Sequence, residues 1–321
     1  MKAPSQKKNN AILRETDFKN LGEKKVGKVR DVYVQPDRII LISTDRHSSF
    51  DRIIAHIPHK GQVLNQISAF WFERTKDIVP NHVTDVPDPN ALVAKKCKPL
   101  PIEVVPRAYI TGVTGTSLWT HYEKGQRDFG SFVLGEGIKK NQKLDIPVLT
   151  PTTKSDKHDR PITPKEIVSE GLLEEGLWNE IAEKSLKLFA RGQQIASEAG
   201  LILVDTKYEF GLDDEGKLIL IDELHTPDSS RYWQQKSYDE KFEKGEHPES
   251  FDKEFLRLWF KKNCDPYNDA VLPAAPEEMV NELSRRYIQI YEQITRQKFE
   301  MDDREDVIER LRKNLGKYAC A

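Results

Sequence analysis

The stretch that most constrains the fold is residues 201–233, LILVDTKYEFGLDDEGKLILIDELHTPDSSRYW. Within it, residues 201–204 and 218–221 are short apolar runs of the kind that form buried strands. The acidic, glycine-containing residues 213–216 lie between the two runs and have the composition of a turn. The sequence therefore predicts two strands joined by a turn at the centre of the fold.

Charged side chains follow both predicted strands. Because alternate residues of a strand share one face, Asp205, Lys207 and Glu209 are expected to project together. If the two strands pair, Asp222 lies near that group. Neighbouring carboxylates repel each other without a counter-ion, and Mg²⁺, which usually binds together with phosphates, suits carboxylate oxygens. Acidic residues after a strand are as commonly a solvated loop or a helix cap, so both interpretations of Asp222 stay open here.

A short polar segment, residues 226–231 with the sequence TPDSSR, follows these carboxylates directly. It has the composition of a turn, and it contains Ser229, Ser230 and Arg231. The planar guanidinium of Arg231 suits a phosphate or a carboxylate group. A cation site followed by an anion site indicates phosphoryl chemistry on an anionic substrate.

Composition excludes several classes of protein. The 50 Lys and Arg residues nearly balance the 52 Asp and Glu residues, which argues against a dedicated nucleic-acid-binding protein. The three cysteines lie too far apart for a disulfide framework or a zinc site. No apolar run approaches the roughly 18 residues of a membrane span, and the first ten residues do not form a secretory signal. We expect a cytoplasmic protein with neither nucleic-acid nor membrane partners.

The first third of the chain predicts a small, largely antiparallel β lobe, which we assign to residues 21–110. Residues 22–43 have the pattern of a hairpin, and residues 61–77 have the pattern of an amphipathic helix. Residues 92–96 and 102–107 are further candidate strands. A sheet assembled from hairpins is largely antiparallel.

The hairpin at residues 22–43 begins with GEKKVGKV, which nearly matches a phosphate-binding P-loop. Val29 stands where that motif needs a hydroxyl group, and the segment continues as a strand, so we reject the P-loop. Gly27 and Lys28 can still fold over ATP phosphates, as the Gly-rich loop of protein kinases does. Most Gly-Lys pairs at strand starts are simple turns with a solvated lysine, so this signal alone is weak.

Residues 111–321 predict a larger α+β lobe, and residues 1–20 a flexible N-terminal tail. In the larger lobe, residues 125–161 have low periodicity, which is typical of a lid or a binding loop. A capping box at residues 163–166 begins a helical region whose longer helix covers residues 177–199. Further helices are predicted over residues 253–262, 276–297 and 303–315, the last with Asp302 and Glu305 as its capping box. These C-terminal helices cover surface that could otherwise pair, which favours a monomer.

Several motifs taken together resemble the phosphoribosylaminoimidazole-succinocarboxamide synthase (SAICAR synthetase) family. They are GKVRDVY at 27–33, STDRHSSFD at 43–51, PRAYITG at 106–112, TPTTKSDKHD at 150–159, VDTKYEFG at 204–211 and DELHTPDSSRYW at 222–233. The resemblance implies an α+β fold with a two-lobe ATP cleft, related in layout to protein kinases and ATP-grasp enzymes. It also implies a ligase that uses ATP and Mg²⁺ to join L-aspartate to carboxyaminoimidazole ribonucleotide (CAIR), by way of an acyl phosphate.

The resemblance assigns roles residue by residue. Contacts with the nucleotide are implied for Gly27, Lys28, Glu103 and Lys154, with Glu103 on a strand that lines the adenine pocket. Contacts with Mg²⁺ are implied for Glu209 and Asp222, and a place at the catalytic centre for Lys207 and Asp205. Contacts with the ribonucleotide substrate are implied for Arg107, Ser117, Ser229, Ser230 and Arg231.

The sequence departs from the family pattern after Arg107. Many members read RGYITGS, whereas here Ala108 follows the arginine and Val113 replaces the serine. The loop is extended as VTGTSLW, so the serine's contact with the substrate phosphate falls to Ser117 or to one of the two preceding threonines, Thr114 and Thr116. A Gly-rich loop at a helix start can hold a phosphate, although a plain connection without a ligand fits the same residues.

The residues alone leave three functions open. The first is an ATP-dependent ligase or kinase-like enzyme, and the second is a metal-dependent phosphoesterase or nuclease. The third is a non-catalytic nucleotide-binding module. The Gly-Lys hairpin and the polar loop at 150–159 favour the first, because a hydrolase needs no second phosphate-covering loop. The near-neutral net charge argues against a nuclease.

Overall fold

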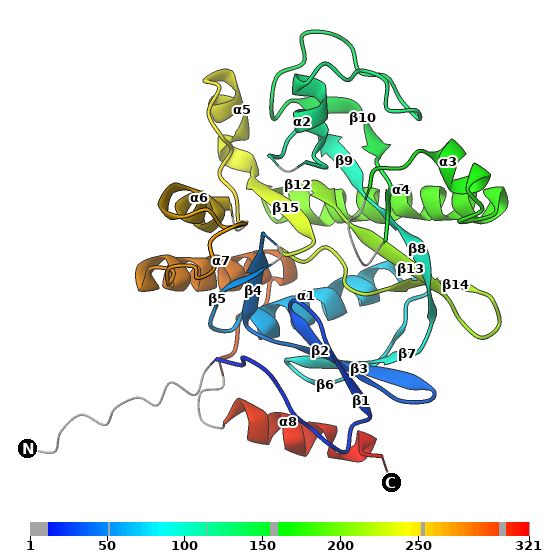
Figure 1. The fold of residues 1–321 in the computed structure, drawn as a ribbon, viewed down its shortest axis with the longest axis vertical. Coiled ribbons are helices and arrows are strands. Elements are labelled where there is room, and N and C mark those ends of the chain that lie inside the picture. Colours follow the sequence, from blue (N-terminus) through cyan, green and yellow to red (C-terminus); the bar gives the residue numbers. More distant parts are fainter. Residues whose placement is uncertain are drawn as a thin grey trace, which may run out of the picture. The chain divides into compact units, whose positions relative to one another are not determined.

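The computed structural model of the chain describes residues 12–50, 52–113, 115–154, 160–251, 254–301 and 306–320. The described residues form two compact units, each assembled from segments that are distant in sequence (Figure 1). The first unit comprises Met1–Phe70, Val83–Lys96 and Lys253–Ala321, and the second comprises Trp71–His82 and Cys97–Asp252. Helices and antiparallel sheets occur in both units, which is the α+β class that the sequence predicts.

The first unit is built on a five-stranded antiparallel sheet with the strand order β1-β2-β3-β7-β6. Its strands are β1 (Glu23–Val26), β2 (Arg30–Val34), β3 (Arg38–Ser43), β7 (Ala91–Lys95) and β6 (Val83–Asp88). A separate two-stranded sheet pairs β4 (Arg46–Ser49) with β5 (Arg52–His56). The helices are the first part of α1 (Lys60–Thr75), then α6 (Glu254–Asn263), α7 (Glu277–Thr295), α8 (Val307–Leu315) and the short 3-10 helix η1 (Gly316–Tyr318).

Two predictions for this unit are confirmed. The hairpin expected over residues 22–43 is present, because β2 pairs with both β1 and β3. The helix expected over residues 61–77 is α1, and its residues Val63, Ile67 and Trp71, spaced by about one helical turn, are fully buried. The periodicity of the apolar residues therefore identified the face of α1 that packs into the core.

Residues 12–20 pack against the same unit, which corrects the prediction of a flexible tail over residues 1–20. Leu13 and Phe18 are buried members of the hydrophobic cluster that forms the core of the first unit. Residues 1–11 lie outside the described residues. The apolar residues between the polar start and the first hairpin were too few to give a recognisable period.

Helix α8 completes that core. Leu311 and Leu315, one turn apart, belong to the same hydrophobic cluster. Beside them, Arg310 Nε lies 3.0 Å from Asp88 Oδ2, and Arg310 Nη2 donates to Asn90 Oδ1 at 2.6 Å. Since the C-terminal helix packs with the N-terminal sheet, the compact units differ from the continuous lobes expected over residues 21–110 and 111–321.

The three predicted C-terminal helices correspond to α6, α7 and α8. The packing stripe of α7 is buried as expected, with Tyr287 and Ile290 almost fully excluded from solvent. Helix α8 begins at Val307 with Asp306 as its N-cap, whose side chain accepts hydrogen bonds from the N–H groups of the first turn. The capping box predicted at Asp302 and Glu305 lies outside the described residues.

The second unit contains two four-stranded sheets, ordered β10-β9-β12-β15 and β11-β8-β13-β14. The first comprises β10 (Lys143–Leu149), β9 (Pro106–Tyr109), β12 (Leu201–Thr206) and β15 (Ser230–Gln234). The second comprises β11 (Thr152–Thr153), β8 (Lys98–Val104), β13 (Tyr208–Leu212) and β14 (Leu218–Ile221). The helices are the rest of α1, then α2 (Leu118–Glu123), α3 (Pro164–Ser169), α4 (Glu175–Glu198) and α5 (Gln235–Glu243).

Helix α4 packs against β12 and β9 and buries the apolar face of their sheet (Figure 1). The capping box predicted at residues 163–166 is present, because the side chains of Thr163 and Glu166 each bond the backbone N–H of the other. The predicted irregular region at residues 125–161 contains β10 and β11, and residues 155–159 within it lie outside the described part.

The predicted pairing of residues 201–204 with residues 218–221 is wrong. Strand β12 pairs with β15 and β9, whereas β14 pairs with β13. The chain passes from one sheet to the other at Lys207, between the end of β12 and the start of β13. A short apolar run shows that a strand is buried, but it does not select the partner, and residues 208–212 supply the strand that pairs with β14.

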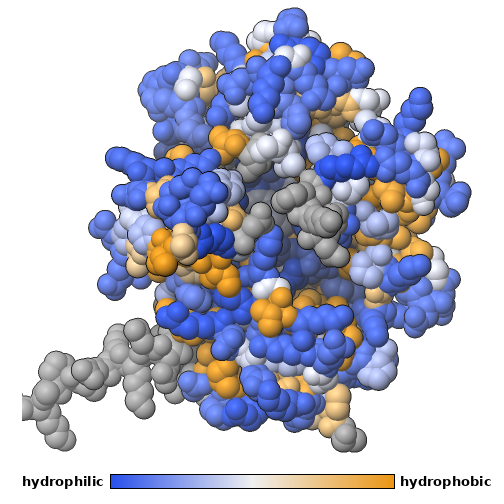
Figure 2. Space-filling model, in the orientation of Figure 1, coloured by the Kyte–Doolittle hydropathy of each residue, from blue (hydrophilic) through white to orange (hydrophobic). Residues whose placement is uncertain are grey.

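Side chains on the surface are mainly polar. On the face drawn in Figure 2, hydrophobic residues occur in small areas separated by hydrophilic ones. Among the described residues, no helix has both the length and the apolar character needed to span a membrane.

We expect the Arg310→Met variant to lower the free energy of unfolding by about 3 kcal/mol, because it leaves the buried Asp88 carboxylate without its cation. Urea denaturation of the purified protein measures this change. The matched control is Arg312→Met, two residues along α8, whose ion pair with Glu309 is exposed and contributes little. Equal stabilities for the two variants would show that the buried pair does not hold α8 to the sheet.

Candidate active site

Lys207 lies at the centre of a cluster of charged side chains in the second unit. Its Nζ donates to Glu103 Oε1 at 2.7 Å and to Glu209 Oε1 at 2.5 Å. The second oxygen of Glu209 forms an ion pair with Lys154. The side chain of Glu209 is only 8% exposed, so water cannot replace these ammonium groups as its partners. We call Glu103, Lys154, Lys207 and Glu209 the charged cluster.

Strand register explains why these carboxylates meet. Strands β8 and β13 pair so that Glu103 lies directly opposite Glu209, and β14 places Ile221 on the other side of Glu209. Asp222 follows Ile221 immediately, so the chain brings it beside the charged cluster as the sequence predicts. Two like charges opposite each other in a sheet are destabilising, and Lys207 offsets that repulsion.

The charge state of Lys207 follows from its neighbours. Burial alone would lower the pKa of Lys207. The negative charges of Glu209, Asp222 and Glu103 outweigh burial and raise this pKa above its usual value. Lys207 is therefore an ammonium ion at neutral pH, suited to neutralising charge and not to accepting a proton.

A second cluster gathers two arginines around Asp205. Arg107 Nη1 lies 3.0 Å from Asp205 Oδ2, and Arg231 forms an ion pair with the same oxygen. The backbone register places all three residues side by side, because Asp205 on β12 pairs with Arg107 on β9 and with Arg231 on β15. Arg107 Nε also donates to Thr150 Oγ1 at 2.8 Å. We call Arg107, Asp205 and Arg231 the guanidinium cluster.

The expectation that Asp205 shares a face and a set of partners with Lys207 and Glu209 is therefore only half right. Lys207 and Glu209 are bonded to each other, whereas the Asp205 carboxylate accepts from the two arginines. The rule that alternate residues share a face applies within one strand, and the chain leaves β12 after Thr206.

Ser117 lies at the guanidinium cluster. It is the N-cap of α2 and is 1% exposed, with its Oγ 2.7 Å from Thr120 Oγ1. Gly112 lies close to both Ser117 and Arg231. A Cβ atom added at Gly112 would meet Ser117 Oγ at 3.1 Å and Arg231 Nη2 at 3.3 Å. Thr116 also reaches the guanidinium cluster, because its carbonyl oxygen accepts from Arg107 Nη2 at 3.4 Å, while Thr114 lies outside the described residues.

Ser229 and Ser230 belong to a tightly bonded turn that leads into β15. Ser230 Oγ donates to Thr206 Oγ1 at 2.7 Å, and the carbonyl oxygen of Ser229 accepts from the N–H of Lys207 at 3.1 Å. The turn thereby connects the guanidinium cluster to the charged cluster. The other two predicted residues, Gly27 and Lys28, lie in the turn between β1 and β2 of the first unit.

The loop that carries Asp222 is conformationally strained. Asp222 and His225 have φ values of 72° and 49°, in the left-handed region that side-chain-bearing residues rarely adopt. Such outliers persist where the surrounding structure holds them, and they occur often at functional sites. Here the ring of His225 is held by Tyr208, whose hydroxyl lies 2.5 Å from Nε2, and Tyr232 donates to the His225 carbonyl at 2.7 Å.

Sequence reasoning missed the residues that support this loop. Gly192 on α4 must lack a side chain, because a Cβ atom there would lie 2.4 Å from His225 Cε1. Nothing in a single sequence marks a helical glycine as the contact surface of a distant histidine. Thr150, by contrast, lies in the polar run TPTTK that the sequence singles out, so its contact with Arg107 could have been anticipated.

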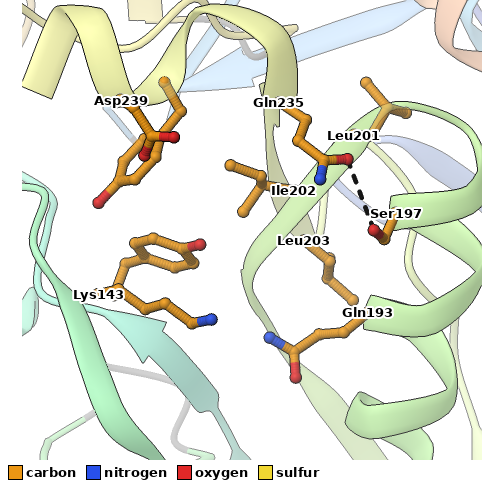
Figure 3. Close-up of a pocket in the computed structure, with 10 residues that line it drawn as sticks. Lys143, Gln193, Ser197, Leu201, Ile202, Leu203, Gln235 and Asp239 are labelled. Atoms are coloured by element: carbon orange, nitrogen blue, oxygen red, sulfur yellow. Dashed lines mark hydrogen bonds between the residues drawn. The ribbon is translucent and has the colours of Figure 1, made fainter.

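A cavity of about 300 Å³ lies elsewhere in the second unit (Figure 3). Its lining includes Leu201 to Leu203 of β12, with Gln193 and Ser197 of α4 facing Gln235 of α5. Ser197 Oγ lies 3.5 Å from Gln235 Oε1. None of the predicted site residues lines this cavity, so its presence neither supports nor opposes their assignment.

The two units define an α+β protein of mixed helices and antiparallel sheets, and comparison with known proteins places it more closely. A model of the SAICAR synthetase family matches residues 23–274. The chain is 56% identical over 290 residues to the phosphoribosylaminoimidazole-succinocarboxamide synthase of Legionella pneumophila (strain Paris), an alignment that covers 90% of this chain and 93% of that protein. The chain therefore belongs to the SAICAR synthetase family.

Solved structures agree with this assignment. A SAICAR synthase from Saccharomyces cerevisiae, complexed with SAICAR, has a TM-score of 0.78 and 33% sequence identity, covering 90% of this chain and 100% of the yeast chain. A type-2 SAICAR synthetase in complex with ADP has a TM-score of 0.65 and 25% identity, covering 87% and 100% of the two chains. The fold class expected from the sequence is thus confirmed.

Burial lowers the pKa of His225 to about 3, so the folded protein holds this ring neutral. An unfolded histidine titrates near 6.5, and stabilisation by the neutral ring is therefore present above that pH and lost as the pH falls below it. We expect the free energy of unfolding to fall by up to about 1.4 kcal/mol per pH unit below pH 6.5 from this residue.

Urea denaturation between pH 7.5 and pH 4.5 measures this loss. The His225→Gln variant should show a shallower pH dependence than the unaltered protein, whereas His247→Gln, at an exposed position, should leave the dependence unchanged. Parallel curves for His225→Gln and the unaltered protein would contradict the assignment of a buried neutral ring.

Proposed function

We propose that the chain is an ATP-dependent carbon–nitrogen ligase that joins L-aspartate to CAIR in purine biosynthesis, giving SAICAR, ADP and phosphate. The observation that carries the proposal is the presence, on neighbouring strands, of a guanidinium cluster and a charged cluster linked by one turn. Membership of the SAICAR synthetase family supports the reaction, and relatives complexed with SAICAR and with ADP support the two classes of ligand.

The guanidinium cluster is the proposed site for the phosphate group of the ribonucleotide. Arg107 and Arg231 are both tied to Asp205, which fixes their planar groups in place before an anion arrives. Ser117 lies near Arg231, and the turn residues Ser229 and Ser230, which immediately precede Arg231, are the other proposed contacts of the ribonucleotide. We accordingly assign Asp205 to positioning the arginines and not to the removal of a proton from L-aspartate.

The charged cluster fits a divalent cation in a limited way. Among the described residues, no group of three or more His, Cys, Asp or Glu side chains could hold a metal ion by itself. Mg²⁺ typically uses one or two carboxylates and completes its shell with substrate phosphates and water. Glu209 and Asp222 supply hard oxygen atoms of that kind, and they are the proposed ligands. Bound there, Mg²⁺ would neutralise charge on the nucleotide phosphates.

The proposed chemistry proceeds in two displacements on the substrates. A carboxylate oxygen of CAIR attacks the γ-phosphorus of ATP, ADP leaves, and an acyl phosphate results. The amine of L-aspartate then attacks the acyl carbon, phosphate leaves, and the nitrogen loses a proton. The role of the protein is positioning and charge neutralisation, for which the permanently charged Lys207 is suited.

The other residues predicted to contact the nucleotide are Gly27, Lys28, Glu103 and Lys154. Lys154 belongs to the charged cluster and is the proposed contact for the phosphates. Glu103 is bonded to Lys207, which supports a place near the phosphates, while its place beside the adenine stays a prediction. The contact of Gly27 and Lys28 with the nucleotide also stays a prediction. A cytoplasmic, monomeric enzyme is our expectation from composition and helix content.

Phosphate release from ATP and Mg²⁺, with CAIR and L-aspartate omitted in turn, tests the proposal. We expect release only when both are present, together with the ultraviolet absorbance of the succinocarboxamide product. Phosphate release that requires neither CAIR nor L-aspartate would favour a metal-dependent phosphoesterase. Binding of ATP without any release would favour the non-catalytic module.

Glu209→Gln is expected to lower kcat at least about 100-fold, the scale of losing one strong electrostatic contact in an active site. It removes a carboxylate charge and keeps the size of the side chain. The matched control is Glu215→Gln in the exposed turn between β13 and β14, which should leave kcat unchanged. Steady-state rates and melting temperatures of both variants distinguish loss of activity from loss of folding. A normal kcat for Glu209→Gln would show that Glu209 is not a metal ligand.

A further inference from the structure

We propose that Lys154 is a displaceable counter-ion. It neutralises Glu209 until a divalent cation takes its place, and its ammonium group then moves to the nucleotide phosphates. The proposal rests on the ligase function above and adds a coupling device to it. It concerns the order of contacts around one carboxylate, Glu209, whose two oxygens are each bonded to a different lysine.

The two lysines differ in how firmly they are held. Lys207 bonds two carboxylates, Glu103 and Glu209, and its side chain is 31% exposed. Lys154 is paired with Glu209 alone among the described residues, and its side chain is 42% exposed. Lys154 is therefore the one that can leave, because its departure breaks one ion pair and that pair already contacts solvent.

The backbone allows Lys154 to move its charge without moving the chain. Its N–H donates to the carbonyl oxygen of Pro101 on β8 at 2.9 Å, directly after the short strand β11. The residue is thus anchored at the sheet, while four flexible carbons carry the ammonium group. A rotation of the side chain alone can take Nζ from Glu209 to a phosphate group bound nearby.

Charge balance gives a reason for the exchange. Glu103, Glu209 and Asp222 contribute three negative charges near Lys207, and Lys207 and Lys154 contribute two positive ones. A divalent cation brings more positive charge to these carboxylates than the single ammonium group it replaces, and the exchange frees that ammonium group for the phosphates that arrive with the metal.

The exchange links the two ligands thermodynamically. A divalent cation that binds alone must break the ion pair between Lys154 and Glu209, and it leaves the displaced ammonium group without an anionic partner. A cation that binds with a nucleotide gives the displaced ammonium group a new anionic partner. Each ligand therefore increases the affinity of the other, and the coupling is reciprocal.

Binding of Mn²⁺, measured by electron paramagnetic resonance of the free ion, tests this coupling with and without ADP. Lys154→Met keeps the length of the side chain and removes its charge. It should bind Mn²⁺ alone roughly fivefold more tightly than the unaltered protein, the scale of one partly exposed ion pair. The gain in Mn²⁺ affinity on adding ADP should shrink by a similar factor. Lys154→Arg, which keeps the charge, should behave like the unaltered protein.

Lys143→Met is the control for a general loss of positive charge, because Lys143 is exposed at the start of β10 and lies outside both clusters. It should leave Mn²⁺ binding unchanged. Circular dichroism verifies that each variant is folded, and Lys154→Gln replaces Lys154→Met if the latter is not.

The outcomes separate the exchange from the proposed function. If Mn²⁺ binds with ADP but Lys154→Met binds Mn²⁺ alone no more tightly than the unaltered protein, the exchange is overturned and the ligase proposal stands. If the unaltered protein binds no Mn²⁺ even with ADP, the exchange and the proposed metal site both fail, while the phosphate-release assay decides the ligase function separately. Tighter binding in Lys143→Met as well as in Lys154→Met would show a non-specific charge effect and would also overturn the exchange.

Discussion

The pairing of β8 with β13 sets the central constraint, because it places the carboxylates of Glu103 and Glu209 directly opposite each other. Like charges in that position oppose sheet formation. Lys207 and Lys154 form ion pairs with these carboxylates and offset the repulsion. The carboxylates that we propose as part of a metal site are therefore already surrounded by positive charge in the folded protein.

Residues 205–209 serve two sites because the chain changes sheets within them. Asp205 is the second-last residue of β12, which lies between β9 and β15, and it pairs with two arginines. Glu209 is the second residue of β13, which lies between β8 and β14. Lys207 stands at the crossing, and its N–H is bonded to the turn that precedes Arg231. The distance between the guanidinium cluster and the charged cluster is therefore set by backbone pairing and not by flexible side chains.

The sequence predicted the features that depend on local spacing. The buried face of α1 and the capping box at Thr163 follow from spacing within one helix. The contact between Lys207 and Glu209 was expected from alternation along a strand and is present, although Lys207 lies between β12 and β13. The pairing of β12 could not be predicted, because any buried strand can pair with any other. The packing of α8 on the N-terminal sheet could not be predicted either. The apolar stripe of α8 indicates that the helix buries one face, but it does not indicate which surface that face packs against.

The residues around Glu209 differ in how they are held. Keeping Asp222 and His225 at positive φ costs on the order of 1–3 kcal/mol each. The buried contacts of His225 with Tyr208 and Tyr232 offset part of that cost. The side chain of Lys154 is 42% exposed, and its ion pair among the described residues is with Glu209, which is 8% exposed. A partly exposed ammonium group beside a buried carboxylate is the arrangement that the proposed exchange of cations requires.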